Sequence, residues 1–91
     1  YHICANALWN NASWATKTHT YLRIYKNNAY YSEGYRTLIY TAITDYIPIR
    51  ISDTLHLSAG EYIDIRLYHN STSSKTILGA TNWNHLSIHR V

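Results

Sequence analysis

The stretch LSAGEYIDIRLYHNS, residues 57–71, shows the clearest structural pattern in this sequence. From residue 62 to residue 68, apolar side chains alternate with tyrosine or charged side chains. The apolar set is Ile63, Ile65 and Leu67, and the other set is Tyr62, Asp64, Arg66 and Tyr68. Successive side chains of a strand point to opposite faces, so the pattern predicts a strand over 61–69 with one apolar face and one polar-aromatic face. A turn signal at Ala59–Gly60 and a polar run over 70–74 mark its ends.

Alternation with a period of two recurs along the rest of the chain, and no segment shows helical periodicity. The strands we predict cover residues 1–9, 20–26, 36–44, 49–57 with a break at Asp53, 61–69, 75–79 and 83–91. Asn27–Asn28 is a tight-turn signal, because asparagine tolerates positive φ. We interpret 10–18 as a polar loop interrupted by Trp14, residues 29–35 as a loop or bent strand with Gly34 as its flexible point, and Asp45 and Pro48 as bracketing a connection. About seven short strands in 91 residues predict an antiparallel sandwich or barrel, in a single domain over 1–91.

The composition excludes several classes of protein. The chain has 10 Tyr and 3 Trp but no Phe or Met, and only 14% of its residues are charged, against about 25% in an average domain. We therefore expect much of the surface to be neutral-polar or buried against a partner. The Lys and Arg residues are scattered, which argues against nucleic-acid binding, and no apolar run approaches the roughly 20 residues that a membrane insertion needs. Cys4 is the only cysteine, so we expect no disulfide framework and an inert thiol on a strand.

Candidate catalytic and metal-binding groups are sparse. The five carboxylates lie in no motif of known geometry, and no Gly-x-Ser-x-Gly elbow is present. His85 and His89 would stand roughly 13 Å apart on one strand face, too far to share a metal within a chain, although each could meet its symmetry copies near a three-fold axis. We therefore expect no enzyme, no catalytic residues, no metal and no cofactor.

Four patches together resemble a known family. They are YHICANALW (1–9), TYLRIYKNN (20–28), LHLSAGEYIDIRLYHNS (55–71) and LSIHRV (86–91). In this order and spacing, the sequence resembles the globular head of the C1q/TNF-like superfamily, in its microbial or phage-fibre versions. The most specific element is 57–63, where Glu61 stands in place of the usual Asp. Further departures are Asn28 for the turn glycine, Leu86 for the usual Phe and Ile88 for the usual Gly.

The resemblance implies an all-β, antiparallel jelly-roll sandwich that forms a homotrimer. It aligns Tyr1 inside about the third strand of the family's fold, so the strands that the family pairs beside its C-terminal strand would be missing, leaving a sheet edge exposed. The expectation is that residues 1–91 are the C-terminal part of a longer chain, whose other segments, or fibre, are among its partners.

Two sets of residues are candidate sites. The first is a subunit interface, because trimer surfaces in the family use aromatic and aliphatic residues of flat sheet faces; the alternative is a row that meets only solvent. Its members are Tyr62, Asp64, Arg66, Tyr68, Leu86 and Ile88. The second is a ligand-binding set of loop aromatics, which could instead pack back on the protein. Its members are Trp14, Tyr30, Tyr31 and Tyr35.

The function that these expectations support is a non-enzymatic trimeric head of a fibre or surface protein, extracellular or on a virion surface. It would trimerise and bind a cell-surface receptor or glycan, in the manner of a viral or phage tail fibre. One alternative is a secreted eukaryotic C1q-like ligand, favoured by the sequons at 11–13 and 70–72. Another alternative is a structural virion decoration or capping module. A glycan-cleaving tailspike is a further alternative, but the sequence shows no pair of carboxylates of the kind that glycosidases use, which argues against it.

Overall fold

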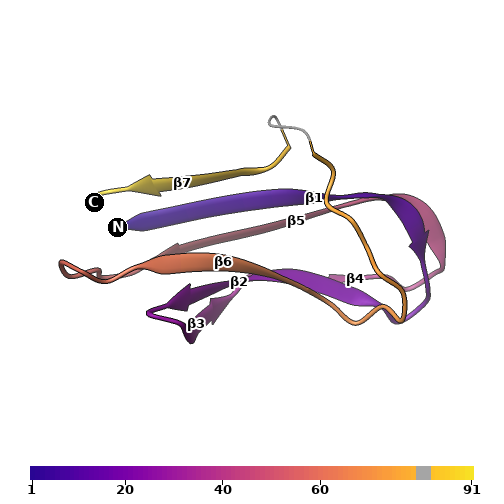
Figure 1. Ribbon diagram of the computed structural model, residues 1–91. Helices are drawn as coiled ribbons and strands as arrows, with labels where there is room; N and C mark the ends of the chain where they lie inside the picture. The colour runs from indigo at the N-terminus through magenta and orange to yellow at the C-terminus, as the bar shows by residue number, and fades with distance from the viewer. Residues whose placement is uncertain (80–82) are drawn as a thin grey trace.

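The computed structural model describes residues 1–79 and 83–91, and in this part of the chain it is all-β. Two antiparallel sheets lie one above the other as in a β-sandwich (Figure 1). One sheet, here sheet A, has the order β5 (Ile43–Thr54), β1 (His2–Trp14), β7 (His85–His89). The other, sheet B, is built around β2 (His19–Lys26), which pairs with β3 (Ala29–Glu33) and β4 (Thr37–Leu38) along one edge and with β6 (Ile63–His69) along the other. The all-β class and antiparallel pairing are therefore confirmed.

The core forms where the inner faces of the two sheets meet. Ile3 and Ala5 of β1 alternate with half-buried residues of the outer face, and Leu22 and Ile24 of β2 do the same in the opposite layer. Isoleucines of β5 at positions 47, 49 and 51 complete the cluster, with the predicted apolar row of β6 packed against it. Period-two burial thus assembles the sandwich from strands that are individually half polar.

A buried hydrogen-bond relay ties the two sheets together. The Trp9 indole Nε1–H donates to Thr20 Oγ1 at 2.7 Å, and the Thr20 hydroxyl donates to the Tyr68 carbonyl at 2.6 Å. Thr20 is fully buried and Trp9 is 5% exposed. Because Thr20 and Trp9 are both buried, loss of the hydroxyl would leave the indole donor without its hydrogen-bond acceptor.

Replacing Thr20 with valine, which keeps the shape of the side chain, is expected to lower the free energy of unfolding by about 1–3 kcal/mol. Urea unfolding monitored by tryptophan fluorescence measures the change. Thr18→Val serves as the control and should cost less, because Thr18 is also buried but its hydroxyl has no hydrogen-bond partner among residues 1–79 and 83–91. An unfolding midpoint for Thr20→Val equal to that of the wild type would show that the relay does not stabilise the fold.

Strand β1 is longer than predicted: residues 10–14 belong to the strand, so the prediction of a loop was wrong there, whereas residues 15–18 are in no strand. The strand runs to Trp14, with a register shift against β5 between Trp9 and Ala12. An extra residue at such a bulge rotates the strand locally. The polar residues of this segment stay partly exposed, while Trp14 turns into the core and is 1% exposed.

Three other strand predictions were also wrong in part. Of 36–44, Thr37–Leu38 form β4 and residues 43–44 begin β5, while the residues between them are in no strand. Of 75–79 only Ile77 forms a bridge, to Trp9. Asp45 and Pro48 lie inside β5 instead of bracketing a connection. β5 is an edge strand whose only partner among the described residues is β1, and a proline, which lacks an amide proton, is tolerated at a sheet edge.

The hairpin predicted at Asn27–Asn28 is confirmed. Both residues have positive φ, 51° and 64°, as a two-residue turn between antiparallel strands requires. The side chain of Asn27 also reaches the chain before β6: its Nδ2 donates to Glu61 Oε2 at 2.8 Å, and its Oδ1 accepts from the Tyr62 amide at 3.1 Å. The turn therefore sets the register of β6 as well as that of β3.

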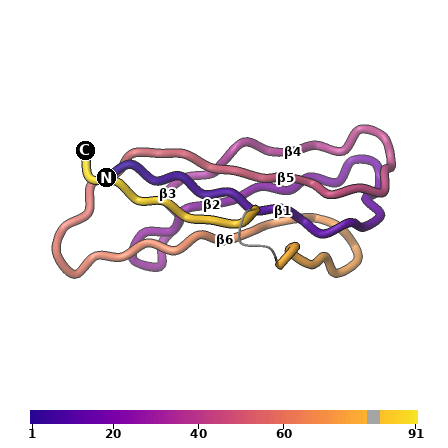
Figure 2. Tube along the Cα trace, turned by 90° about the horizontal axis from the view of Figure 1, so that it is seen from above, coloured from indigo at the N-terminus to yellow at the C-terminus, as the bar shows by residue number. Residues whose placement is uncertain are grey.

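One long side of the sandwich is open. Within the described residues β6 pairs only with β2, and β7 pairs only with β1, and both free edges lie on the same side (Figure 2). Leu86 stands opposite Ala5 and Ile88 opposite Ile3, so both leucine and isoleucine face the core layer, yet they are 50% and 44% exposed. Leu67 of β6 is 41% exposed for the same reason. Apolar side chains directed at the core therefore meet solvent along this side.

Candidate recognition and assembly surface

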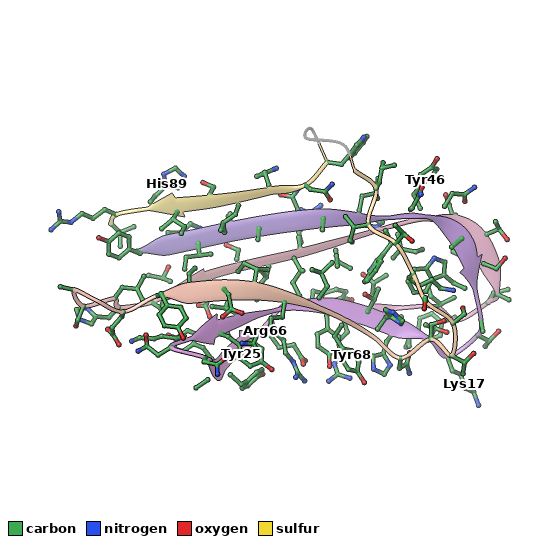
Figure 3. The ribbon with its side chains drawn as sticks, viewed as in Figure 1. Lys17, Tyr25, Tyr46, Arg66, Tyr68 and His89 are labelled. Atoms are coloured by element: carbon green, nitrogen blue, oxygen red, sulfur yellow. The ribbon has the colours of Figure 1, made fainter. Side chains whose placement is uncertain are left out.

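The outer face of sheet B gathers aromatic and arginine side chains. Because Leu22 and Ile24 point into the core, Tyr21, Arg23 and Tyr25 point outward, and β6 adds its own outward row. In Figure 3, Tyr25, Arg66 and Tyr68 project from this sheet away from the other layer. We call this surface the aromatic face; its members are His19, Tyr21, Arg23, Tyr25, Tyr30, Arg36, Arg66 and Tyr68.

Three rings form a stack at one end of the aromatic face. Tyr21 and Tyr68, paired across β2 and β6, have ring centroids 4.8 Å apart, and His19 stacks within 6.0 Å of both. Directly opposed aromatic side chains on neighbouring strands stabilise sheets in this way. Tyr21 is only 2% exposed, whereas Tyr68 is 41% exposed. The stack thus has a fixed inner ring and an accessible outer one.

Arginines lie over the rings. The Arg23 guanidinium carbon is 5.1 Å from the Tyr21 ring centroid and 5.0 Å from that of Tyr30, and Arg66 lies 3.8 Å above Tyr25. Such cation–π contacts are favourable by about 0.5–1 kcal/mol at exposed sites. Arg23 and Arg66 are directly opposed across the two strands. Their like charges are tolerated because each has its own carboxylate: Glu33 lies 3.3 Å from Arg23, and Asp64 lies 2.7 Å from Arg66.

Glu33 anchors two arginines. Its carboxylate accepts from Arg36 at 3.0 Å and from Arg23 at 3.3 Å. The hydrogen bond from Arg36 is the main cause that lowers the pKa of Glu33, and the same contact raises the pKa of Arg36. Glu33 is therefore ionised near neutral pH. With three arginines against Glu33 and Asp64, the aromatic face carries an excess positive charge and can offer both ring faces and guanidinium donors to a ligand.

Of the four predicted ligand-binding aromatic residues, three tyrosines are exposed and the tryptophan is buried. Tyr30 and Tyr31 lie on β3, at 55% and 43% exposure, and Tyr35 follows that strand at 84%. Tyr30 contacts Arg23 and the Tyr25 ring, so it belongs to the aromatic face. Trp14 was wrongly placed on an exposed loop: it is buried edge-on against Trp9, with centroids 5.9 Å apart, and cannot offer its ring to a ligand.

The six predicted interface residues do not share one face. Tyr62, Asp64, Arg66 and Tyr68 lie in or beside β6, with the last two on the aromatic face. The other two, Leu86 and Ile88, belong to β7 of the opposite sheet and point toward the core layer. Asp64 and Arg66 are paired within the chain.

Sequence reasoning missed Tyr21 and Arg23 of β2, and Arg36 of the segment after β3, as members of this surface. The pattern Tyr21-x-Arg23-x-Tyr25 was visible, but its alignment with β6 depends on a register that the sequence alone does not give. A second missed juxtaposition lies on sheet A, where the Cys4 thiol is 3.6 Å from His2 Nε2. Both residues sit on one strand two positions apart, on a flat sheet face.

No group of three or more histidine, cysteine or carboxylate side chains that could hold a metal ion occurs in residues 1–79 and 83–91. No helix in the same ranges is long and apolar enough to cross a membrane. In comparisons with known proteins, no protein-family model, no curated protein and no solved structure matches this chain.

Proposed function

We propose that this protein is a non-enzymatic head domain of a fibre or surface protein that binds a receptor or surface polymer through its aromatic face. In this proposal the sandwich is of the C1q/TNF-like jelly-roll type and assembles as a homotrimer, outside the cell or on a virion. The observation that carries the proposal is the aromatic face itself: stacked tyrosines and arginines, fixed from below and accessible from outside.

The strand order supports the proposed fold type. The chain passes from sheet A to sheet B after β1, returns for β5, crosses again for β6 and ends in sheet A with β7. Repeated crossing between two antiparallel sheets is the pattern of Greek-key sandwiches, to which the jelly roll belongs. The open side also lies beside β7, where the resemblance expects further strands to pair.

The chemistry of the aromatic face supports recognition of sugars. Exposed Tyr30 and Tyr68 present flat apolar surfaces with hydroxyl groups at low entropic cost, since each has only two side-chain torsions. Arg23 and Arg36 are held over the rings with their geometry set by Glu33. A pre-organised face of this kind loses little conformational freedom when a rigid ligand such as a pyranose ring lies on it.

A glycan array tests this function. The wild type is expected to bind at least one class of oligosaccharide, and Tyr30→Ser to weaken that binding about tenfold, equivalent to about 1.4 kcal/mol. Tyr40→Ser is the matched control, because Tyr40 is 79% exposed and lies outside the aromatic face. Absence of any sugar binding by the wild type, or equal binding by the Tyr30 and Tyr40 variants, would contradict the proposal.

A further inference from the structure

The free edge of β6 has its main-chain groups directed at the open side. The Tyr62 carbonyl accepts from the Asn27 amide at 2.9 Å, and the Tyr68 carbonyl accepts from Thr20 Oγ1, so the polar main-chain groups of the even-numbered residues face β2. Main-chain groups point alternately to the two sides of an antiparallel strand. The amide and carbonyl groups of Ile63, Ile65 and Leu67 therefore face outward, where no described strand pairs with them.

The side chains of this segment are symmetric about Ile65. The sequence reads Tyr-Ile-Asp-Ile-Arg-Leu-Tyr from residue 62 to residue 68. An antiparallel strand with the same sequence, centred on the same isoleucine, brings like shapes and opposite charges together. Tyr62 then stands opposite the second copy's Tyr68, Ile63 opposite its Leu67, and Asp64 opposite its Arg66. The edge is complementary to itself.

From this symmetry we propose that two copies of the chain pair through β6, antiparallel about a two-fold axis at Ile65. The central pair and its neighbours at 63 and 67 then exchange main-chain hydrogen bonds, because those are the residues whose amides and carbonyls face the edge. A two-fold contact of this kind uses the same patch on both copies. It joins two four-stranded B sheets into one continuous sheet.

Charge and burial select this register. A two-fold centred on Arg66 would oppose two arginines, and one centred on Asp64 would oppose two aspartates, and like charges directly opposite each other destabilise strand pairing. In the proposed register each guanidinium meets a carboxylate with spare capacity: Asp64 Oδ2 accepts from Arg66 of its own chain, while Oδ1, although enclosed, has no hydrogen-bond partner among the described residues.

The same contact covers exposed apolar surface. Leu67, 41% exposed and directed at the core layer, is placed against the second copy's Ile63. Leu86 and Ile88 belong to β7, which pairs with β1 in the opposite sheet. In Figure 2, β7 (yellow) runs along the same open side. An unpaired edge with exposed apolar side chains is a site of association with another chain. Here the charge pattern identifies that chain as a second copy of the protein.

Charge reversal tests the pairing and its register together. In Arg66→Asp the strand carries aspartate at 64 and 66, and in Asp64→Arg it carries arginine at both. When a variant pairs with itself, residue 64 of each copy stands opposite residue 66 of the other with the same charge. We therefore expect the two-fold association of each variant alone to weaken at least tenfold, measured by sedimentation velocity. An equimolar mixture opposes unlike charges again and should restore a mixed pair with affinity near that of the wild type, detected by native mass spectrometry.

Mixing distinguishes a pairing contact from a structural effect, since a variant that simply unfolds is not rescued by a second variant. Arg50→Asp, an equal charge change on the outer edge strand β5, should leave association unchanged. Retained pairing in both single variants, or failure of the mixture to form mixed pairs while circular dichroism shows folded chains, would overturn the proposal. Sugar binding through Tyr30 is read separately, so either proposal can fail alone.

Discussion

Replacing Trp14 with alanine is expected to lower the free energy of unfolding by about 3–5 kcal/mol, the range observed when a large aromatic side chain is removed from a packed core. Trp14 is 1% exposed, packs edge-on against Trp9 and His69, and carries the Lys75 ammonium 5.1 Å above its ring. A domain of this size has a total stability of only about 5–15 kcal/mol. The variant should therefore be largely unfolded at modest urea concentrations, as circular dichroism will show.

Trp83→Ala provides the matched control for Trp14. Trp83 is half exposed, so its loss removes less buried apolar surface and should cost clearly less stability. If Trp14→Ala and Trp83→Ala unfold at the same urea concentration, the burial of Trp14 at the end of β1 is contradicted.

Gly34→Ala is expected to cost about 1–3 kcal/mol of stability through overpacking. A Cβ atom at this position would lie 2.6 Å from the Arg50 carbonyl oxygen and 3.0 Å from Ile51 Cβ. The Gly34 amide is held in place by the Leu22 carbonyl at 2.7 Å, so the segment cannot move away from β5 without breaking that bond. Gly34 is thus required for close approach between sheets and is not the flexible point that the sequence suggested.

Gly79→Ala is the control for Gly34, because a Cβ atom there meets no atom of the described residues within 4 Å. Thermal unfolding of both variants measures the difference: a large fall in melting temperature for the first and a change near zero for the second. Equal melting temperatures would show that the close packing of Gly34 on β5 does not hold in solution.

Local patterns predicted the elements whose conformation depends on few neighbours. The alternation over 61–69 and 20–26 gave β6 and β2 with the correct faces inward, and Asn27–Asn28 gave the hairpin. Elements set by tertiary context were mispredicted. The bulge that turns Trp14 inward depends on pairing between β1 and β5, and Pro48 is accommodated because β5 is an edge strand, which no local pattern reveals.

Only part of the aromatic face was predicted from the sequence. The outward row of β6 was read correctly from its alternation, and Tyr30 of β3 was named as a ligand-binding residue. The partners on β2 were not predicted, because stacking of Tyr21 on Tyr68 depends on a cross-strand register. That register is fixed by the turn at Asn27, whose side chain bonds both Glu61 and Tyr62. Asp64 and Arg66 lie symmetrically about Ile65 with opposite charges. This pattern indicates self-pairing only because the structure leaves the outer edge of β6 unpaired among the described residues.

The central claim is that this chain works as an assembly of identical copies, with a three-fold contact from the proposed head and a two-fold contact through β6. The smallest closed assembly that contains both symmetries has six chains. Light scattering coupled to size exclusion measures its mass directly. We expect about 64 kDa for the wild type, from a chain of 10.6 kDa, and half that mass for Arg66→Asp. A stable species of 10.6 kDa at micromolar concentration would contradict it.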